Sequence, residues 1–200
     1  MGLTSSALKQ KDLDEYQQLT YFTEQEILEA FRMFKSLGKE EVKQNALKAK
    51  IPFPRIQELP QLRMNPFRDR ICEVFSSTDD EHMNFEDFLH MMSVFSDKAP
   101  KDLKAHYAFN IYDLDNDERI SERDLLEVLD RLTVGMNMGE QSEYLLSQDE
   151  KQKVVEEIMK VGDLDRDKFI YHSSLRQKSS GMQYYIIFYL AVSFYYYYFY

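Results

Sequence analysis

The residues with the clearest chemical potential are carboxylates at alternate positions of one acidic stretch, DLDNDERISERD, residues 113–124. Alternate side chains of a tightly turning loop point to the same side, and a hard cation such as Ca2+ binds about six to eight oxygens. The candidate ligands in loop order are Asp113, Asp115, Asp117, Arg119 through its backbone carbonyl, Ser121 and Asp124. With apolar helical patterns on either side, the stretch predicts a Ca2+ or Mg2+ site of the helix–loop–helix type called an EF-hand.

Two residues of this loop depart from the usual pattern. Glu118 stands at loop position 6, where glycine normally allows a positive φ, so we expect a cost of about 1 kcal/mol if that turn is kept. Asp124 stands at position 12 in place of the usual glutamate, and its shorter side chain makes the smaller Mg2+ a competitor of Ca2+. Ile120 at position 8 is the apolar residue expected to pair with a sister loop.

A second copy of the pattern begins at residue 163 and is less complete. Its candidate ligands are Asp163, Asp165, Asp167 and the carbonyl of Phe169. Lys168 at position 6 brings a positive charge to the site, and Ser174 at position 12 cannot chelate a cation with two oxygens. The sequence therefore predicts weak cation binding here, with a solvated acidic turn as the alternative.

Two further loops have the spacing of an EF-hand without its ligands. With Met83 at position 8, positions 1, 3, 5 and 12 are occupied by Ser76, Thr78, Asp80 and Asp87. These are too few carboxylates to offset the dehydration of a divalent ion. The region around residues 51–62 is rich in proline and has Lys or Gln where ligands belong. We interpret both loops as structural.

The elements that must position these loops are helices. Apolar residues recur at helical spacing in 23–37, 65–77, 85–97, 102–112, 122–132 and 149–161. Thr23 with Glu26 three residues later forms a capping box at the start of the first of these segments. Strand signals are limited to short positions such as Ile120 and Ile170. We predict an all-α protein of four EF-hand helix–loop–helix units in two lobes, with the last unit incomplete.

This organisation divides the chain into four parts. They are an N-terminal extension (1–22), a lobe of two non-metal EF-hands (23–98), a lobe with the third and fourth hands (99–178), and an aromatic tail (179–200). The tail admits three interpretations: an artefact or disordered segment, a helical membrane anchor, or a β segment.

Composition excludes several functional classes. The chain has 35 acidic and 25 basic residues and a net charge of -10, which opposes nucleic-acid binding. Its single cysteine, Cys72, cannot form an internal disulfide, and with no secretory leader pattern this favours a reducing, cytoplasmic setting. Metalloprotease, hydrolase and nucleotide-binding motifs are missing from the sequence, so we do not expect an enzyme.

The sequence resembles the calcium- and integrin-binding protein family over residues 1–167. The similar segments are EYQQLTYFTEQEIL, LPQLRMNPFRDRICEVFS, FEDFLHMMSVFSD, LKAHYAFNIYDLDND and DLDRD. The resemblance implies four EF-hands of which only the last two bind Ca2+ or Mg2+, with Asp usual at position 12 of the third. It also implies a regulatory protein that docks amphipathic helices in a hydrophobic groove, including integrin α-subunit cytoplasmic tails, with kinases as further partners.

Both ends of the chain carry additional hypotheses. The start, MGLTSS, matches the N-myristoylation pattern with Gly2 as the acylated residue, a feature that the resembled family shares. A single acyl chain binds membranes reversibly, so we expect peripheral contact at the inner face of the plasma membrane, with a nuclear location as an alternative. After Asp167 the family pattern stops, which we interpret as a retained intron, altered splicing or a gene-model error.

The preferred hypothesis is a Ca2+- or Mg2+-dependent adaptor that binds a partner helix near a membrane. The alternative is a divalent-cation buffer without a protein target.

Overall fold

The computed structural model describes residues 8–135 and 146–173. The chain divides into two compact units, one of Met1–Arg63 with Ile71–Lys104 and one of Met64–Arg70 with Ala105–Tyr200. The lobe boundary expected from the sequence, between residues 98 and 99, differs from this division. Residues 64–70 join the second unit, where the ring of Phe67 packs edge-on against Tyr112 with 5.3 Å between centroids.

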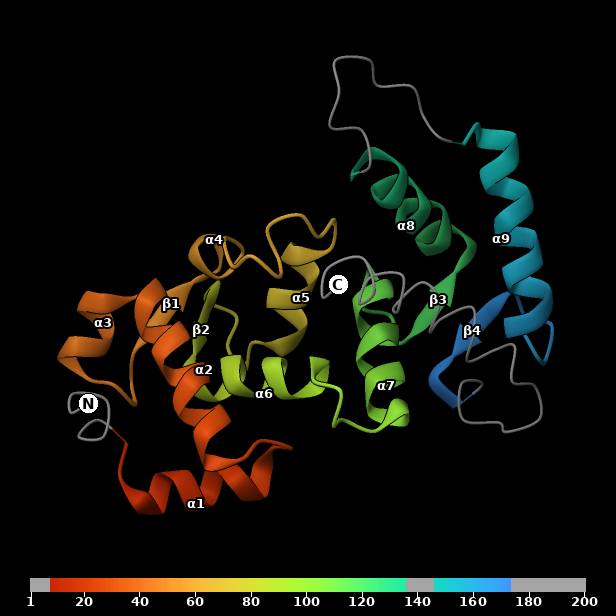
Figure 1. Ribbon diagram of the computed structural model, residues 1–200. Coiled ribbons are helices and arrows are strands. Elements are labelled where there is room, and N and C mark those ends of the chain that lie inside the picture. The colour runs from red at the N-terminus through yellow and green to blue at the C-terminus, as the bar shows by residue number, and fades with distance from the viewer. Residues whose placement is uncertain (1–7, 136–145, 174–200) are drawn as a thin grey trace. The chain divides into compact units, whose positions relative to one another are not determined.

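Helices dominate the described residues and confirm the all-α class (Figure 1). The first part of the chain forms α1 (Gln10–Leu19), α2 (Glu24–Leu37), α3 (Lys39–Gln44), β1 (Lys50–Pro52), α4 (Phe53–Ile56), α5 (Arg68–Phe75), β2 (His82–Asn84) and α6 (Phe85–Phe95). The remainder forms α7 (Lys101–Tyr112), β3 (Arg119–Ser121), α8 (Glu122–Gly135), α9 (Gln148–Gly162) and β4 (Phe169–Tyr171).

Local sequence signals explain where several helices begin. Thr23 caps α2, and its capping box with Glu26 is present as predicted. The helix predicted from Pro66 begins instead at Arg68, as α5, and buries Cys72 completely. α6 opens with a second capping box, in which the Asn84 side chain accepts a hydrogen bond from the N–H of Asp87.

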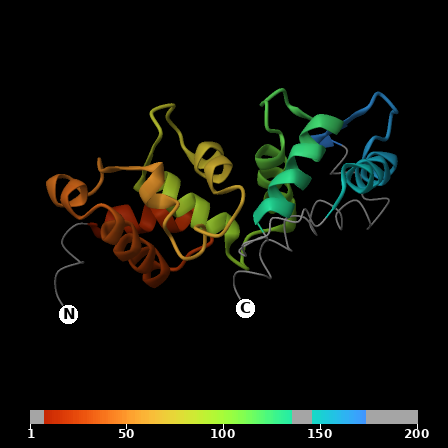
Figure 2. The same cartoon turned by 90° about the horizontal axis from the view of Figure 1, so that it is seen from above.

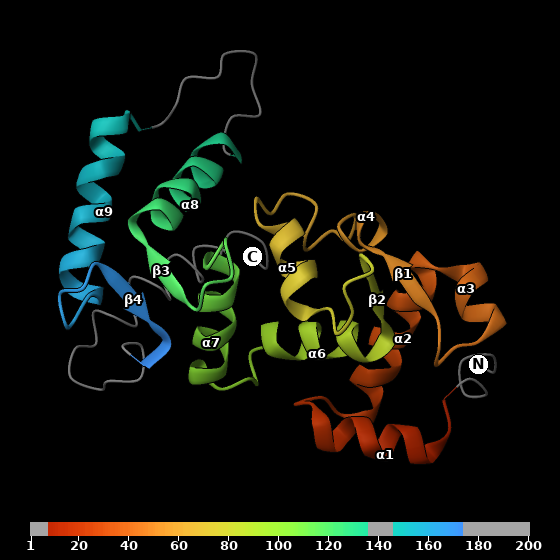
Figure 3. The ribbon, with the colours of Figure 1, turned by 180° about the vertical axis from the view of Figure 1, so that it is seen from behind.

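Two short antiparallel ladders join the four loops in pairs: β1 of the first loop with β2 of the second (residues 76–87), and β3 of the third (residues 113–124) with β4 of the fourth (from residue 163). In the first unit β1 pairs with β2, which brings Ile51 opposite Met83. In the second unit β3 lies beside β4 (Figure 3). The register of this pair brings Ile120 opposite Ile170, as the apolar position-8 residues predict. All four of these side chains are buried. Each ladder therefore fixes one loop against its neighbour.

Aromatic rings form the core of the first unit. Phe31 and Phe34 of α2 contact Phe85 of α6, with ring centroids 5.0 and 5.5 Å apart respectively. Tyr16 of α1 adds an edge-on contact to Phe85 at 5.5 Å. These contacts hold α1 and α6 to α2, and they place α1 in the core of the first unit, although no helix is predicted for residues 1–22.

The second unit has a more aliphatic core. α8 and α9 pack together (Figure 2), with Val128 and Val155 buried. Lys151 of α9 is also buried, and its Nζ donates to Asp130 Oδ1 of α8 at 2.6 Å. This ion pair ties the helix that leaves the third loop to the helix that enters the fourth.

Candidate metal centre

The third loop begins where α7 ends. Asp113 follows Tyr112, the last residue of α7, and is only 5% exposed. Its two carboxylate oxygens accept hydrogen bonds from the N–H groups of Asp117 (3.1 Å) and Glu118 (2.9 Å). Burial raises the pKa of the Asp113 carboxyl, while these N–H donors oppose that shift. The loop is thus wound around the carboxylate at its first position.

Three carboxylates of this loop converge. One oxygen each of Asp113, Asp115 and Asp117 lie within 4.8 Å of one another. Asp115 and Asp117 are exposed, so solvent reaches the cluster from their side. Arg119 approaches it, with Nε donating to Asp117 Oδ2 at 2.6 Å.

The sixth position of the loop adopts the backbone conformation that favours glycine. Glu118 has φ of 66°, and the equivalent residues of the second and fourth loops, Glu81 and Lys168, have φ of 56° and 73°. A residue with a Cβ is strained in this region by about 1–2 kcal/mol. Three loops therefore keep the EF-hand turn despite an unfavourable residue, so the condition stated for the cost at Glu118 is met.

Asp124 closes the loop and also caps the next helix. It is 4% exposed, and its Oδ2 accepts from the N–H and the hydroxyl of Ser121 at 2.9 and 2.6 Å. Its Oδ1 accepts from the N–H of Leu114 at 3.2 Å. Both oxygens are therefore engaged by the protein, at the first turn of α8 and at the start of the loop.

The donor set of the third loop fits a hard divalent cation. It consists only of oxygens, from carboxylates, one hydroxyl and one backbone carbonyl, and three of the carboxylates converge at one point. The carbonyl belongs to Arg119, which lies in β3 and is held by pairing with Tyr171 of β4. The residues therefore suit Ca2+ or Mg2+ better than a metal that prefers nitrogen or sulfur ligands.

The fourth loop repeats this geometry in a more exposed form. Carboxylate oxygens of Asp163, Asp165 and Asp167 lie within 4.8 Å of one another. Asp163 accepts from the N–H groups of Asp167 (3.1 Å) and Lys168 (2.9 Å), as Asp113 does in the third loop. Phe169 lies in β4, where the guanidinium of Arg119 sits 4.1 Å from its ring centroid. Ser174 lies outside the described residues.

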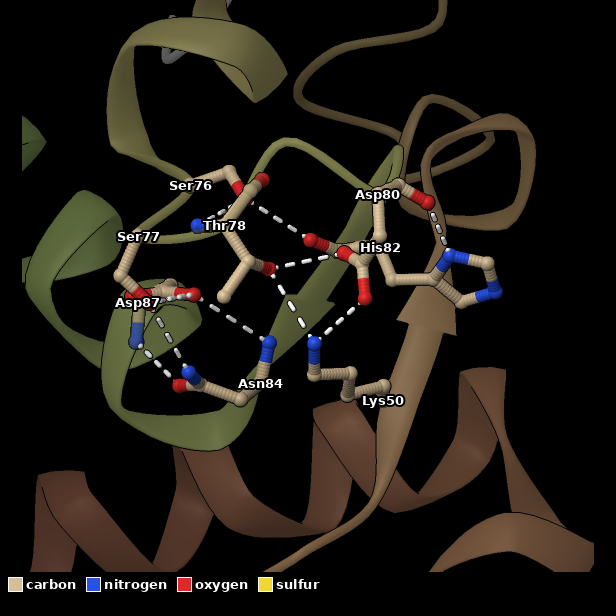
Figure 4. A network of polar contacts seen from close by, with 8 residues as sticks. All are labelled: Lys50, Ser76, Ser77, Thr78, Asp80, His82, Asn84 and Asp87. Carbon is tan, nitrogen blue, oxygen red and sulfur yellow. Dashed lines mark hydrogen bonds and ion pairs between the residues drawn. The ribbon is translucent and has the colours of Figure 1, made fainter.

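The second loop has a lysine ammonium among its polar groups. Lys50 of β1 contacts Thr78 and Asp80, the residues at loop positions 3 and 5 (Figure 4). Sequence spacing gave no sign of this contact, because Lys50 belongs to the preceding loop and reaches its neighbour only through the β1–β2 ladder.

Arg70 is a second residue that sequence reasoning missed. It is 6% exposed, and its Nη2 donates to the carbonyls of Asp113 (2.7 Å) and Asn110 (3.0 Å) and to Asn116 Oδ1 (2.9 Å). Asn116 has φ of 58°, so the guanidinium holds the loop at a left-handed residue. No local signal distinguishes Arg70 from the other charged residues of α5, because its partners lie about 40 residues later in the chain.

Other predicted features lie outside the described residues: Gly2 and the whole segment 179–200. Within residues 8–135 and 146–173, no helix has both the length and the apolar character of a transmembrane span.

Comparison with known proteins gives a consistent set of relatives. The chain is 38% identical over 172 residues to calcium and integrin-binding family member 2 of Drosophila melanogaster, covering 84% of this chain and 86% of the relative. It is 38% identical over 170 residues to calcium and integrin-binding family member 3 of Homo sapiens and 37% identical over 170 residues to member 2 of Mus musculus, with the same coverage. No family model matches the chain.

Proposed function

The chain belongs to the calcium and integrin-binding protein family, and on this premise we propose that it is a calcium-binding EF-hand regulator that docks a partner helix. Its role is regulatory rather than catalytic. The single observation that carries the proposal is the convergence of Asp113, Asp115 and Asp117 on one point of the third loop.

The third loop is the principal cation site in this proposal. Its ligands are Asp113, Asp115, Asp117, the carbonyl of Arg119, Ser121 and Asp124. A bound divalent cation supplies positive charge that offsets the repulsion among these carboxylates. Asp113 directly follows α7, and Asp124 lies in the first turn of α8. A cation bound to both residues would therefore constrain the angle between these two helices.

We propose that the third loop binds Mg2+ as well as Ca2+. Asp124 has a short side chain whose oxygens already bind Ser121 and Leu114. A side chain held in this way favours one oxygen rather than two as ligand, and Mg2+ requires fewer protein oxygens than Ca2+. The fourth loop is a weaker site, with Asp163, Asp165, Asp167 and the carbonyl of Phe169 as ligands.

The proposed partner is an amphipathic helix of a membrane receptor tail. The relatives' names specify integrin binding, so an integrin α-subunit cytoplasmic tail is the first candidate, and a kinase segment is the second. We further propose that the protein is cytoplasmic and peripheral at the inner face of the plasma membrane, through myristoylation of Gly2 with a second contact from the bound receptor tail.

A peptide-binding measurement with and without cation tests the function. A labelled integrin α-tail peptide is titrated with the protein in EDTA, in millimolar Mg2+ and in millimolar Ca2+. We expect at least about tenfold tighter binding with cation, equivalent to about 1.4 kcal/mol. The double variant Asp113→Ala, Asp124→Ala should lose this dependence, whereas Asp79→Ala, which removes an exposed carboxylate of the second loop, should retain it.

The same measurement separates the regulator from a cation buffer. A buffer would bind Ca2+ by calorimetry and yet bind no peptide in any condition. Equal peptide affinity for the wild type and the double variant in all three solutions would refute cation control.

A further inference from the structure

The second loop contains an internal network that satisfies most of its polar groups. At position 1, the Ser76 hydroxyl lies 2.8 Å from the carbonyl oxygens of both Thr78 and His82, at positions 3 and 7. At position 12, Asp87 Oδ2 accepts from the Ser77 hydroxyl at 3.1 Å. Positions 1, 3, 7 and 12 supply ligands in a cation-binding loop, but here their polar groups form hydrogen bonds within the loop.

The remaining oxygens of the loop face a positive charge from outside it. Lys50 Nζ donates to Thr78 Oγ1 at 3.2 Å and forms an ion pair with Asp80 Oδ2. Thr78 Oγ1 donates to Asp80 Oδ1 at 2.7 Å, so Lys50, Thr78 and Asp80 contact one another (Figure 4). We propose that Lys50 is the built-in cation of the second loop, holding it in the EF-hand form and excluding a divalent ion from it.

A count of charges supports this assignment. Positions 1, 3 and 5 carry three carboxylates in the third loop but only one, Asp80, in the second. One ammonium offsets the charge of Asp80, while the other carboxylate at a ligand position of this loop, Asp87 at position 12, accepts a hydrogen bond from Ser77. The three carboxylates that converge in the third loop suit a doubly charged ion instead. In agreement, the hydrogen bond from Lys50 lowers the pKa of Asp80 to about 2.

The strand ladder explains why this lysine reaches the loop. Lys50 lies opposite Asn84 in the β1–β2 ladder, next to the buried pair of Ile51 and Met83. The position of its Cα is therefore set by backbone pairing and by the core. Lys48, two residues earlier, is exposed and precedes the strand.

The proposal predicts that the two ladders respond differently to chelator. The amides of Ile51 and Met83 should keep their protection from hydrogen exchange in EDTA, because their loop carries its own cation. Accelerated exchange at these amides on removal of Ca2+ and Mg2+ would overturn the proposal. Hydrogen exchange at the amides of Ile120 and Ile170 reports on the proposed cation site of the third loop. The two pairs of amides are measured separately, so one proposal can fail while the other holds.

Substitution of the lysine gives the direct test. In Lys50→Met, NMR titration of the Asp80 carboxyl should show its pKa rising from about 2 toward the ordinary value of 3.8. Lys48→Met should leave it unchanged, and Lys50→Arg, which retains the charge, should keep it low. An unchanged Asp80 pKa in Lys50→Met would overturn the assignment.

A gain-of-binding experiment tests the exclusion of divalent ions. Ser76→Asp with Thr78→Asp restores three carboxylates at positions 1, 3 and 5 of the second loop. Ca2+ binding, followed at the Glu81 amide by NMR, should be at least about tenfold tighter when Lys50→Met is added to this pair, because an ammonium no longer competes for the oxygens. Equal Ca2+ affinity with and without Lys50 would refute its role in exclusion.

Discussion

Replacing Glu118 by glycine should stabilise the second unit. Glu118 has φ of 66°, where a side chain with a Cβ costs about 1–2 kcal/mol. Glycine removes this cost but gives the unfolded chain more freedom, which costs about 0.4–1 kcal/mol. The expected net gain in the free energy of unfolding lies between about 0 and 1.6 kcal/mol, and the midpoint of about 0.8 kcal/mol corresponds to about 2–3 °C in Tm for a chain of this size.

The assay is thermal and urea unfolding in EDTA, so that cation binding does not contribute. Glu118→Ala is the matched control, because it removes the exposed carboxylate but keeps the Cβ. The Glu118 N–H donates to Asp113 Oδ2 at 2.9 Å, and this hydrogen bond is available in all three proteins. If Glu118→Gly were no more stable than Glu118→Ala, the strain argument for this loop would be wrong.

Three other substitutions test the site and the fold. Asp124→Glu adds the reach for a second oxygen, so calorimetry should show about tenfold tighter Ca2+ binding with little change for Mg2+, and a parallel gain for both ions would contradict this. Lys98 Nζ donates to Glu26 at 2.6 Å and lowers the pKa of that carboxyl to about 2. The pair therefore stabilises fully above about pH 4.5, and its contribution is lost as the pH falls through about 2, where half of Glu26 is protonated. Lys98→Met should cost about 1 kcal/mol or less at pH 6 and clearly less at pH 2, whereas an equal loss at both would indicate packing. Phe85→Ala should cost about 3–5 kcal/mol in urea unfolding, because Phe85 is buried among other rings, and a loss below about 1 kcal/mol would contradict the assigned core.

Periodicity predicted the long helices because their apolar positions recur over several turns. The capping box of Thr23 and Glu26 even located the start of α2. In contrast, α1 has only two buried side chains, Leu13 and Tyr16, in a polar segment. Its place depends on the contact of Tyr16 with Phe85, which is distant in sequence, so local patterns do not reveal it.

The candidate site, like the fold, was predictable where its residues are close in sequence. Spacing identified the three carboxylates that converge, because neighbours in one loop are neighbours in space. Spacing could not show that Asp124 accepts hydrogen bonds from Leu114 and Ser121, or that Arg70 donates one to the carbonyl of Asp113 at the start of the third loop. Such contacts depend on tertiary arrangement and on strand register.

The engagement of Asp124 bears on how readily the third loop can be filled and emptied. A cation that binds Asp124 must share this carboxylate with the donors of Ser121 and Leu114, which weakens the contact between the cation and the oxygen. A weaker contact shortens the time that the ion stays bound. We therefore expect modest occupancy at low cation concentration and rapid turnover, the kinetic profile of a sensor rather than of a store.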